Sequence, residues 1–161
     1  MKVKSWLFEA ARWLAAVAAV VYLVVLLGGN TVSSAAFADV EKAVMAQVDT
    51  ANMQKAENQM IKRLYGLDPG SFEGCILYYP VTNMGAEEVL LVKLSDIAQQ
   101  ETVAQAVEAR LQTQRNTFEG YGVEQFDLLT NHYVLQLQGN FVLFAVGDFC
   151  QDALTAFRDA L

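Results

Sequence analysis

Hydrophobic and polar positions along the chain predict one long apolar segment followed by a domain of helices and strands. The segment runs from Trp13 to Leu27 without interruption, and no charged residue occurs between Arg12 and Asp39. Counted from Trp13 to Val32, it reaches the roughly 20 residues that a helix needs to cross a bilayer core. We therefore predict three parts: a basic tail over 1–12, a transmembrane helix over 13–32 and an extracytoplasmic domain over 33–161.

Apolar spacings of three and four predict the helices of this domain, and runs of strand formers predict two hairpins. The helices cover 35–48 with a cap at Ser34, 53–65, 97–118, a short piece over 123–129, and a last helix after Asp148; the hairpins pair 75–81 with 87–94 and 132–138 with 141–146. The order α-ββ-α-ββ-α predicts an α+β fold with a four-stranded, mainly antiparallel sheet and helices mostly on one face. Because both hairpins are apolar on both sides, we expect the first helices to cover part of the second face.

A short motif that occurs twice suggests an internal repeat. Tyr65-Gly66-Leu67-Asp68 and Tyr121-Gly122-Val123-Glu124 each stand at the end of a predicted helix and precede a hairpin. Each hairpin leads into Asp-x-x-Gln, at Asp96 and at Asp148, which is the arrangement of a capping box. The alternative explanation is convergence on common helix caps.

The charge changes sign along the chain and predicts its orientation. Residues 1–38 carry a net charge of +2, and residues 39–161 carry −9. The positive-inside rule then places the N-terminus in the cytoplasm and the acidic domain outside. We predict a single-pass protein of the cell membrane, held there through residues 13–32. The total charge of −7 argues against a nucleic-acid partner, whose phosphates require clustered Lys and Arg.

A cleaved signal peptide is the alternative to a retained anchor. Ala36-Phe37-Ala38 fits a small-residue cleavage site, so the alternative is secretion after cleavage at Ala38. Alanine is frequent throughout this region, and an apolar stripe that begins at Phe37 and continues through Val40 and Val44 would be shortened by the cut. We therefore favour an uncleaved anchor.

Composition and motifs point away from the common enzyme classes. With 54% hydrophobic residues and two cysteines, the chain is neither disordered nor a disulfide-rich scaffold. It contains no phosphate-cradling glycine loop and no nucleophile-elbow or zinc-protease motif. His132, the one histidine, lacks partners at ligand spacing, and the acidic pair Glu87-Glu88 is expected on a solvated face. We predict no catalytic residues, no metal and no cofactor.

Two cysteines and three aromatic residues are the remaining candidate site residues. Cys75 and Cys150 could form a disulfide, Cys150 could be a reactive thiol near a helix start, or both could be small core residues. Tyr78, Tyr79 and Phe141 could line a ligand groove or pack in the core.

Motifs across nearly all of the predicted extracytoplasmic part resemble a bacterial family of unknown function. These are Phe37-x-Asp39-Val40, Leu64-Tyr65-Gly66-Leu67-Asp68, Glu87-x-x-Leu90-x-x-Lys93, Arg110-Leu111-x-x-Gln114 with Phe118-x-x-Tyr121, and Gly139-Asn140-Phe141-Val142-Leu143-Phe144. The resemblance implies a small extracytoplasmic protein of Gram-positive bacteria, attached as a membrane-anchored protein or a lipoprotein. It implies no activity, substrate or catalytic residue. No cysteine of the lipobox type follows the apolar segment, which favours the membrane anchor.

Together these patterns predict a non-enzymatic binding or assembly module of the cell envelope, with a protein or peptide partner. The first alternative is a small-ligand-binding or sensing domain. The second is a thiol-dependent redox enzyme that uses Cys150.

Overall fold

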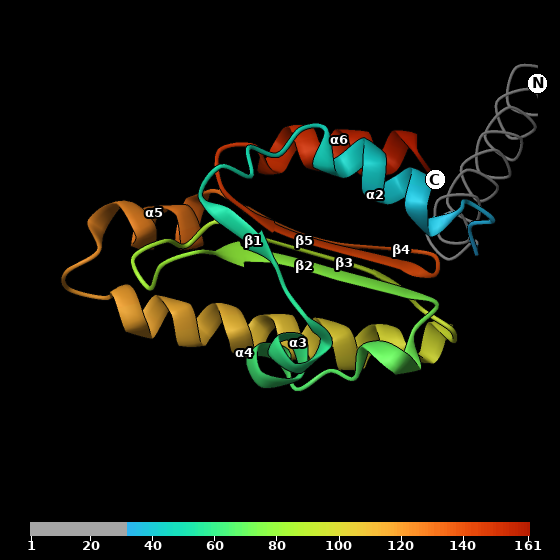
Figure 1. The fold of residues 1–161 in the computed structure, drawn as a ribbon, viewed down its shortest axis with the longest axis horizontal. Coiled ribbons are helices and arrows are strands. Elements are labelled where there is room, and N and C mark those ends of the chain that lie inside the picture. The colour runs from blue at the N-terminus through green and yellow to red at the C-terminus, as the bar shows by residue number, and fades with distance from the viewer. Residues whose placement is uncertain (1–31) are drawn as a thin grey trace, which may run out of the picture. The chain divides into compact units, whose positions relative to one another are not determined.

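Runs of strand formers build an antiparallel sheet of five strands in the order β1-β2-β3-β5-β4 (Figure 1). This computed structural model describes residues 32–161. The strands are β1 (Met53–Lys55), β2 (Gly74–Pro80), β3 (Glu88–Lys93), β4 (Tyr133–Gln138) and β5 (Phe141–Val146). Both predicted hairpins are present, β2 with β3 and β4 with β5, and β3 joins them by pairing with β5.

Five α-helices surround the sheet in the part of the chain that the structure describes. They are α2 (Phe37–Met45), α3 (Asn58–Tyr65), α4 (Gln100–Phe118), α5 (Val123–Asn131) and α6 (Cys150–Asp159). The mixed α+β class and the antiparallel sheet are therefore confirmed. The predicted cap at Ser34 is wrong, because α2 begins at Phe37 after Ala36 and has no side-chain cap.

The helices cover both faces of the sheet, so the prediction of helices mostly on one face is wrong. Figure 1 shows α2 and α6 above the sheet and α3 and α4 below it. Strand side chains alternate between two buried clusters, and Leu77 and Leu90 pack on the α4 side while Ile76 and Leu91 pack on the α6 side. An apolar strand that is buried on both faces requires a helical layer on each.

The fifth strand, β1, replaces the start of the helix predicted over 53–65. Met53 is buried on the α2 and α6 side and pairs with Pro80, while Gln54 and Lys55 stay exposed. The helix begins only at Asn58. An extended segment buries Met53 against the sheet and extends the ladder beyond β2, and tertiary packing of this kind overrides a short helical period.

The two motif copies do not form a repeat in space. The helix after the first hairpin, α4, packs on one face, and the helix after the second, α6, packs on the other. The capping box forms at Asp96 and Gln99, but α6 has no side-chain cap. Gly147, with φ of +139°, stands where the chain turns from β5 towards α6, in a conformation that favours glycine.

The described chain begins beside the β4–β5 turn. The amide of Ser33 donates to Oδ1 of Asn140 (2.8 Å), and its hydroxyl donates to the carbonyl of Leu161 (3.1 Å). Because Glu88 pairs with Val146 and the two strands are antiparallel, the β2–β3 turn lies at the opposite end of the sheet.

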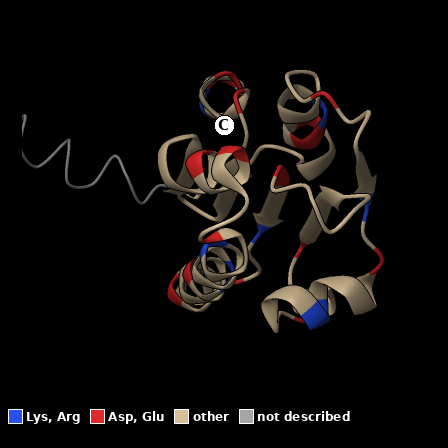
Figure 2. Ribbon diagram, turned by 90° about the vertical axis from the view of Figure 1, so that its left-hand side faces the viewer, with Lys and Arg blue, Asp and Glu red and all other residues tan. Residues whose placement is uncertain are grey.

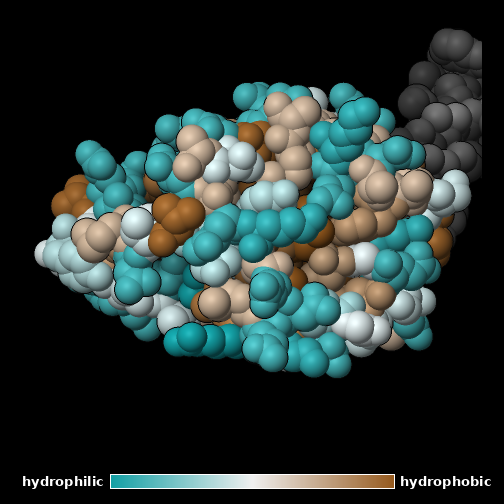
Figure 3. Space-filling view, in the orientation of Figure 1, coloured by the Kyte–Doolittle hydropathy of each residue, from teal (hydrophilic) through white to brown (hydrophobic). Residues whose placement is uncertain are grey.

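The predicted basic tail and transmembrane helix lie outside the described residues, apart from Val32 at the end of the helix. Within residues 32–161, no helix combines the length and hydrophobicity that a membrane crossing requires. Charged residues of the described part lie mostly on helices and loops (Figure 2). Hydrophilic residues cover most of the face in Figure 3, with separate small hydrophobic spots.

Candidate functional site

A cleft of about 290 Å³ opens between α3, α4 and the β2–β3 turn. Part of its lining is apolar and is formed by Met60, Leu64, Tyr79 and Pro80. These residues come from α3 and from the end of β2. This apolar part can pack against the carbon skeleton of a ligand.

The rest of the lining is mainly polar and carries positive charge. Arg63 comes from α3, Arg110 and Gln114 come from α4, and Asn83 comes from the β2–β3 turn. Arg63 and Asn83 are exposed, while Arg110 and Gln114 are half-buried. A mixed lining of this kind is typical of a binding site, where a few polar groups orient what the apolar side holds.

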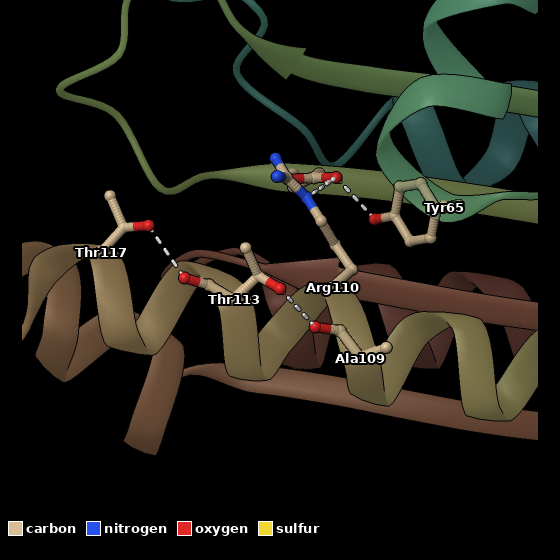
Figure 4. A network of polar contacts seen from close by, with 6 residues as sticks. Tyr65, Ala109, Arg110, Thr113 and Thr117 are labelled. Carbon is tan, nitrogen blue, oxygen red and sulfur yellow. Dashed lines mark hydrogen bonds and ion pairs between the residues drawn. The ribbon is translucent and has the colours of Figure 1, made fainter.

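Behind the cleft, Arg110 is fixed by a buried carboxylate. Glu88, at the start of β3, is only 1% exposed. The Arg110 guanidinium donates from Nη2 to Oε2 of Glu88 (2.8 Å) and from Nε to both carboxylate oxygens (3.2 and 3.3 Å). The hydroxyl of Tyr65, at the end of α3, donates to Oε1 (2.5 Å). Figure 4 shows Arg110 reaching from α4 towards the strand, with the Tyr65 hydroxyl approaching from the other side.

Burial and charge keep Tyr65 and Arg110 each in one protonation state. Burial raises the pKa of Tyr65 well above its usual range, and the charge and hydrogen bond of Glu88 raise it further. Burial by itself lowers the pKa of Arg110, but the charge and hydrogen bonds of Glu88 outweigh it and the pKa is raised. Tyr65 therefore stays a hydrogen-bond donor and Arg110 stays a cation, so the network holds a guanidinium in place at the cleft.

Sequence reasoning missed this network, and the prediction that Glu88 lies on a solvated face is wrong. Glu88 alternates with Leu90 and Val92 along β3, and these residues are buried on the α4 side. Arg110 follows Val107 by three positions and Val103 by seven, which places it along the apolar stripe of α4. Glu88 on β3 and Arg110 on α4 each occupy a position in an apolar pattern. Opposite charges at such positions on two elements that pack together indicate a buried ion pair.

The structure places Cys75 and Cys150 on opposite faces of the sheet. Cys75 packs against the cluster on the α4 side, and Cys150 belongs to the cluster on the α6 side. Both thiols are free. Burial raises the pKa of Cys75 to about 12, and burial also raises that of Cys150 despite a hydrogen bond from Gln151. A raised pKa lowers the thiolate fraction on which thiol chemistry depends.

Of the three aromatic candidates, only Tyr79 lines the cleft. Tyr78 points to the other face, where the Lys55 ammonium lies 5.8 Å from its ring centre. Phe141 is fully buried and packs edge-on against Phe157. Because successive strand residues face opposite sides of the sheet, the three rings do not meet in one groove.

His132 lies between two exposed aspartates. Its Nδ1 is 2.9 Å from Oδ1 of Asp148, and its Nε2 is 3.6 Å from Oδ2 of Asp127. The contacts link the end of α5 to the turn before α6. Within residues 32–161, no group of three or more His, Cys, Asp or Glu side chains is arranged to hold a metal ion.

The comparisons with known proteins give one match. A family model described as a domain of unknown function, DUF4358, matches residues 46–147. The matched range includes the cleft and all three residues of the network behind it. No curated protein and no solved structure gives a significant match to the chain.

Proposed function

We propose, for a chain that belongs to the DUF4358 family of domains of unknown function, a role as a non-enzymatic binding or assembly module of the cell envelope. In this proposal, residues 13–32 anchor the chain in the membrane of a Gram-positive bacterium. The domain from residue 33 onward acts on the extracytoplasmic side and binds a protein or peptide of the envelope.

The observation that carries the proposal is the cleft backed by the Glu88–Arg110 pair. A buried carboxylate holds the guanidinium by three hydrogen bonds, so the polar side of the cleft is organised before any partner arrives. Such preorganisation lowers the entropy that binding costs. The described chain begins at the other end of the sheet from the β2–β3 turn, beside which the cleft opens.

A small-ligand-binding or sensing domain is the second candidate, and the size of the cleft favours it. A volume of about 290 Å³ is close to the lower end of the range for small-molecule sites. The same volume also fits one or two side chains of a peptide, so the two candidates share the cleft and differ in what enters it.

Site-specific photocrosslinking in intact cells tests the binding role. A photoreactive residue at Asn83, on the cleft, is expected to give a discrete protein or peptide adduct. The matched control is Thr102, which is exposed on α4 outside the cleft and is expected to give none. Failure to form an adduct at Asn83, or equal adducts at both positions, would contradict binding of a macromolecule through the cleft.

Labelling with a membrane-impermeant maleimide tests the location. An Asn83→Cys variant of the full chain presents an exposed thiol, whereas Cys75 is half-buried with a raised pKa and Cys150 is buried. We expect intact cells to label this variant, and we expect the labelled chain to remain with the membrane fraction. Labelling only after permeabilisation would overturn the extracytoplasmic location, and recovery of a shortened chain from the medium would favour cleavage at Ala38.

A further inference from the structure

We infer that the cleft recognises a carboxylate group, held by the guanidinium groups of Arg63 and Arg110. The inference rests on the proposed binding role and adds the chemistry of the ligand. A carboxylate at the end of a peptide and one on a small organic acid present the same group to the cleft.

The first argument is the local charge. Residues 39–161 carry a net charge of −9, yet the cleft lining contains two arginines and no Asp or Glu. Glu88, behind the lining, balances Arg110. Arg63 has no ion-pair partner among the described residues, whereas the neighbouring Lys62 pairs with Asp68. The lining therefore has a surplus positive charge in an otherwise acidic domain, which favours an anionic ligand over a cationic one.

The second argument is the set of unused hydrogen-bond donors. Nε and Nη2 of Arg110 hold Glu88, whereas Nη1 donates to no acceptor among residues 32–161. No buried side-chain nitrogen or oxygen in this part of the chain lacks a partner, so Nη1 is accessible to solvent. The side-chain amides of Gln114 and Asn83 also make no hydrogen bond with described residues. The three residues that carry these donors line the same cleft.

The third argument is shape. Guanidinium groups are planar and match the two oxygens of a carboxylate, which makes Arg the preferred partner of this group. Met60, Leu64 and Tyr79 offer an apolar side for the carbon atoms attached to it. The volume of about 290 Å³ suits an acid with an apolar side chain better than a large cofactor.

Ligand-observed NMR on the full chain in detergent micelles tests the inference. The probes are N-acetyl-leucine, its amide N-acetyl-leucinamide, and the dipeptide N-acetyl-alanyl-leucine with a free carboxylate. We expect both acids to bind at least about tenfold more tightly than the amide, because the amide lacks the charge that pairs with Arg63 and Arg110. Tighter binding of the dipeptide identifies a peptide end as the source, and equal binding of the two acids identifies a small acid.

Matched variants on α3 assign the effect to the cleft. Arg63→Gln removes a positive charge from the lining and is expected to weaken binding of the acids about tenfold. Lys62→Gln removes the same charge from the neighbouring exposed position, which is outside the lining, and is expected to leave binding unchanged. Equal binding of acid and amide, equal effects of the two variants, or no binding of either acid would overturn the inference. In any of these cases an adduct at Asn83 would still support the proposed function, and its absence would count against that function separately.

Discussion

Glu88 places a carboxylate on a sheet face that is otherwise apolar, and the structure surrounds it with donors. Arg110 contributes three hydrogen bonds and Tyr65 contributes one. A buried ion pair is rarely the most stable arrangement for its position, because two charges lose their hydration. In this domain the pair holds the Arg110 guanidinium at the cleft.

A double-mutant cycle measures how strongly the two charges depend on each other. We expect Arg110→Met to lower the free energy of unfolding by roughly 3 kcal/mol, because it leaves the buried Glu88 carboxylate without its partner. We expect Glu88→Leu to lower it by less, because the half-buried Arg110 can still reach water at the cleft. The double variant is expected to lose less than the sum of the two. Urea unfolding of the full chain in micelles, followed by near-ultraviolet circular dichroism, gives the values. Simple additivity would show that the two residues do not interact energetically.

Stability at alkaline pH depends on Cys75. Its pKa is raised by burial from 9.0 to about 12 in the folded state. Below pH 9 the Cys75 thiol stays protonated in both the folded and the unfolded state. Between pH 9 and 12 the unfolded state releases it first, so the free energy of unfolding falls as the pH rises. We expect Cys75→Ala to make this decline shallower in unfolding experiments at several pH values, and parallel declines in both proteins would contradict the assignment.

At the scale of elements, the Asp-x-x-Gln pattern forms a capping box at Asp96 but forms no cap at Asp148. Asp96 accepts from the amide of Ala98 and Gln99 returns to the amide of Asp96, as a capping box requires. Asp148 instead contacts His132, and the first turn of α6 has no side-chain cap. Asp96 stands at the N-cap position of its helical turn, whereas the N-cap of α6 is Phe149, one residue after Asp148.

Paired substitutions at the two aspartates test this difference. Asp96→Ala is expected to lower the free energy of unfolding by about 1 kcal/mol, which is typical of a lost N-cap. Asp148→Ala is expected to cost less than about 0.5 kcal/mol, because it removes only an exposed contact with His132. Thermal unfolding of the two variants in parallel provides the comparison. An equal loss at both positions would mean that Asp148 caps α6 in solution.

Local sequence patterns predicted the hairpins and most of the helices. They did not predict the features that depend on residues far away in the sequence. The turn at Gly139 and Asn140 and the apolar runs beside it were enough to predict β4 and β5. Met53 became a strand residue only because β2 lies next to it, and Tyr79 was separated from Tyr78 and Phe141 by the alternation of faces. The pair of Glu88 and Arg110 joins a strand to a helix 22 residues later in the chain, so no local window contains both.

At the scale of the whole molecule, β3 and β5 form the centre of the sheet, and their pairing joins the two hairpins. All residues of β5 are buried, and β3 pairs on both sides. The outer strands differ from them, since β1 has only three residues and β4 is paired on one side only. Stability is therefore expected to decrease from the middle of the sheet towards its edges.

Hydrogen exchange of the full chain in micelles checks this gradient. Amides of β3 and β5 are expected to exchange slowest, at rates set by global unfolding, and those of β1 much faster through local opening. Peptide-level mass spectrometry resolves the two regions. Protection of β1 equal to that of β3 would show that the first strand is an integral part of the core.

The pairing of β3 with β5 also has a consequence for the order in which the chain is made. Synthesis completes β3 at Lys93, but its partner does not begin until Phe141. Until the ribosome has added that stretch, β3 has an unpaired edge, and its face towards α6 lacks that helix, which are features that promote aggregation. We therefore expect the chain to depend most on a chaperone during this stage of its synthesis.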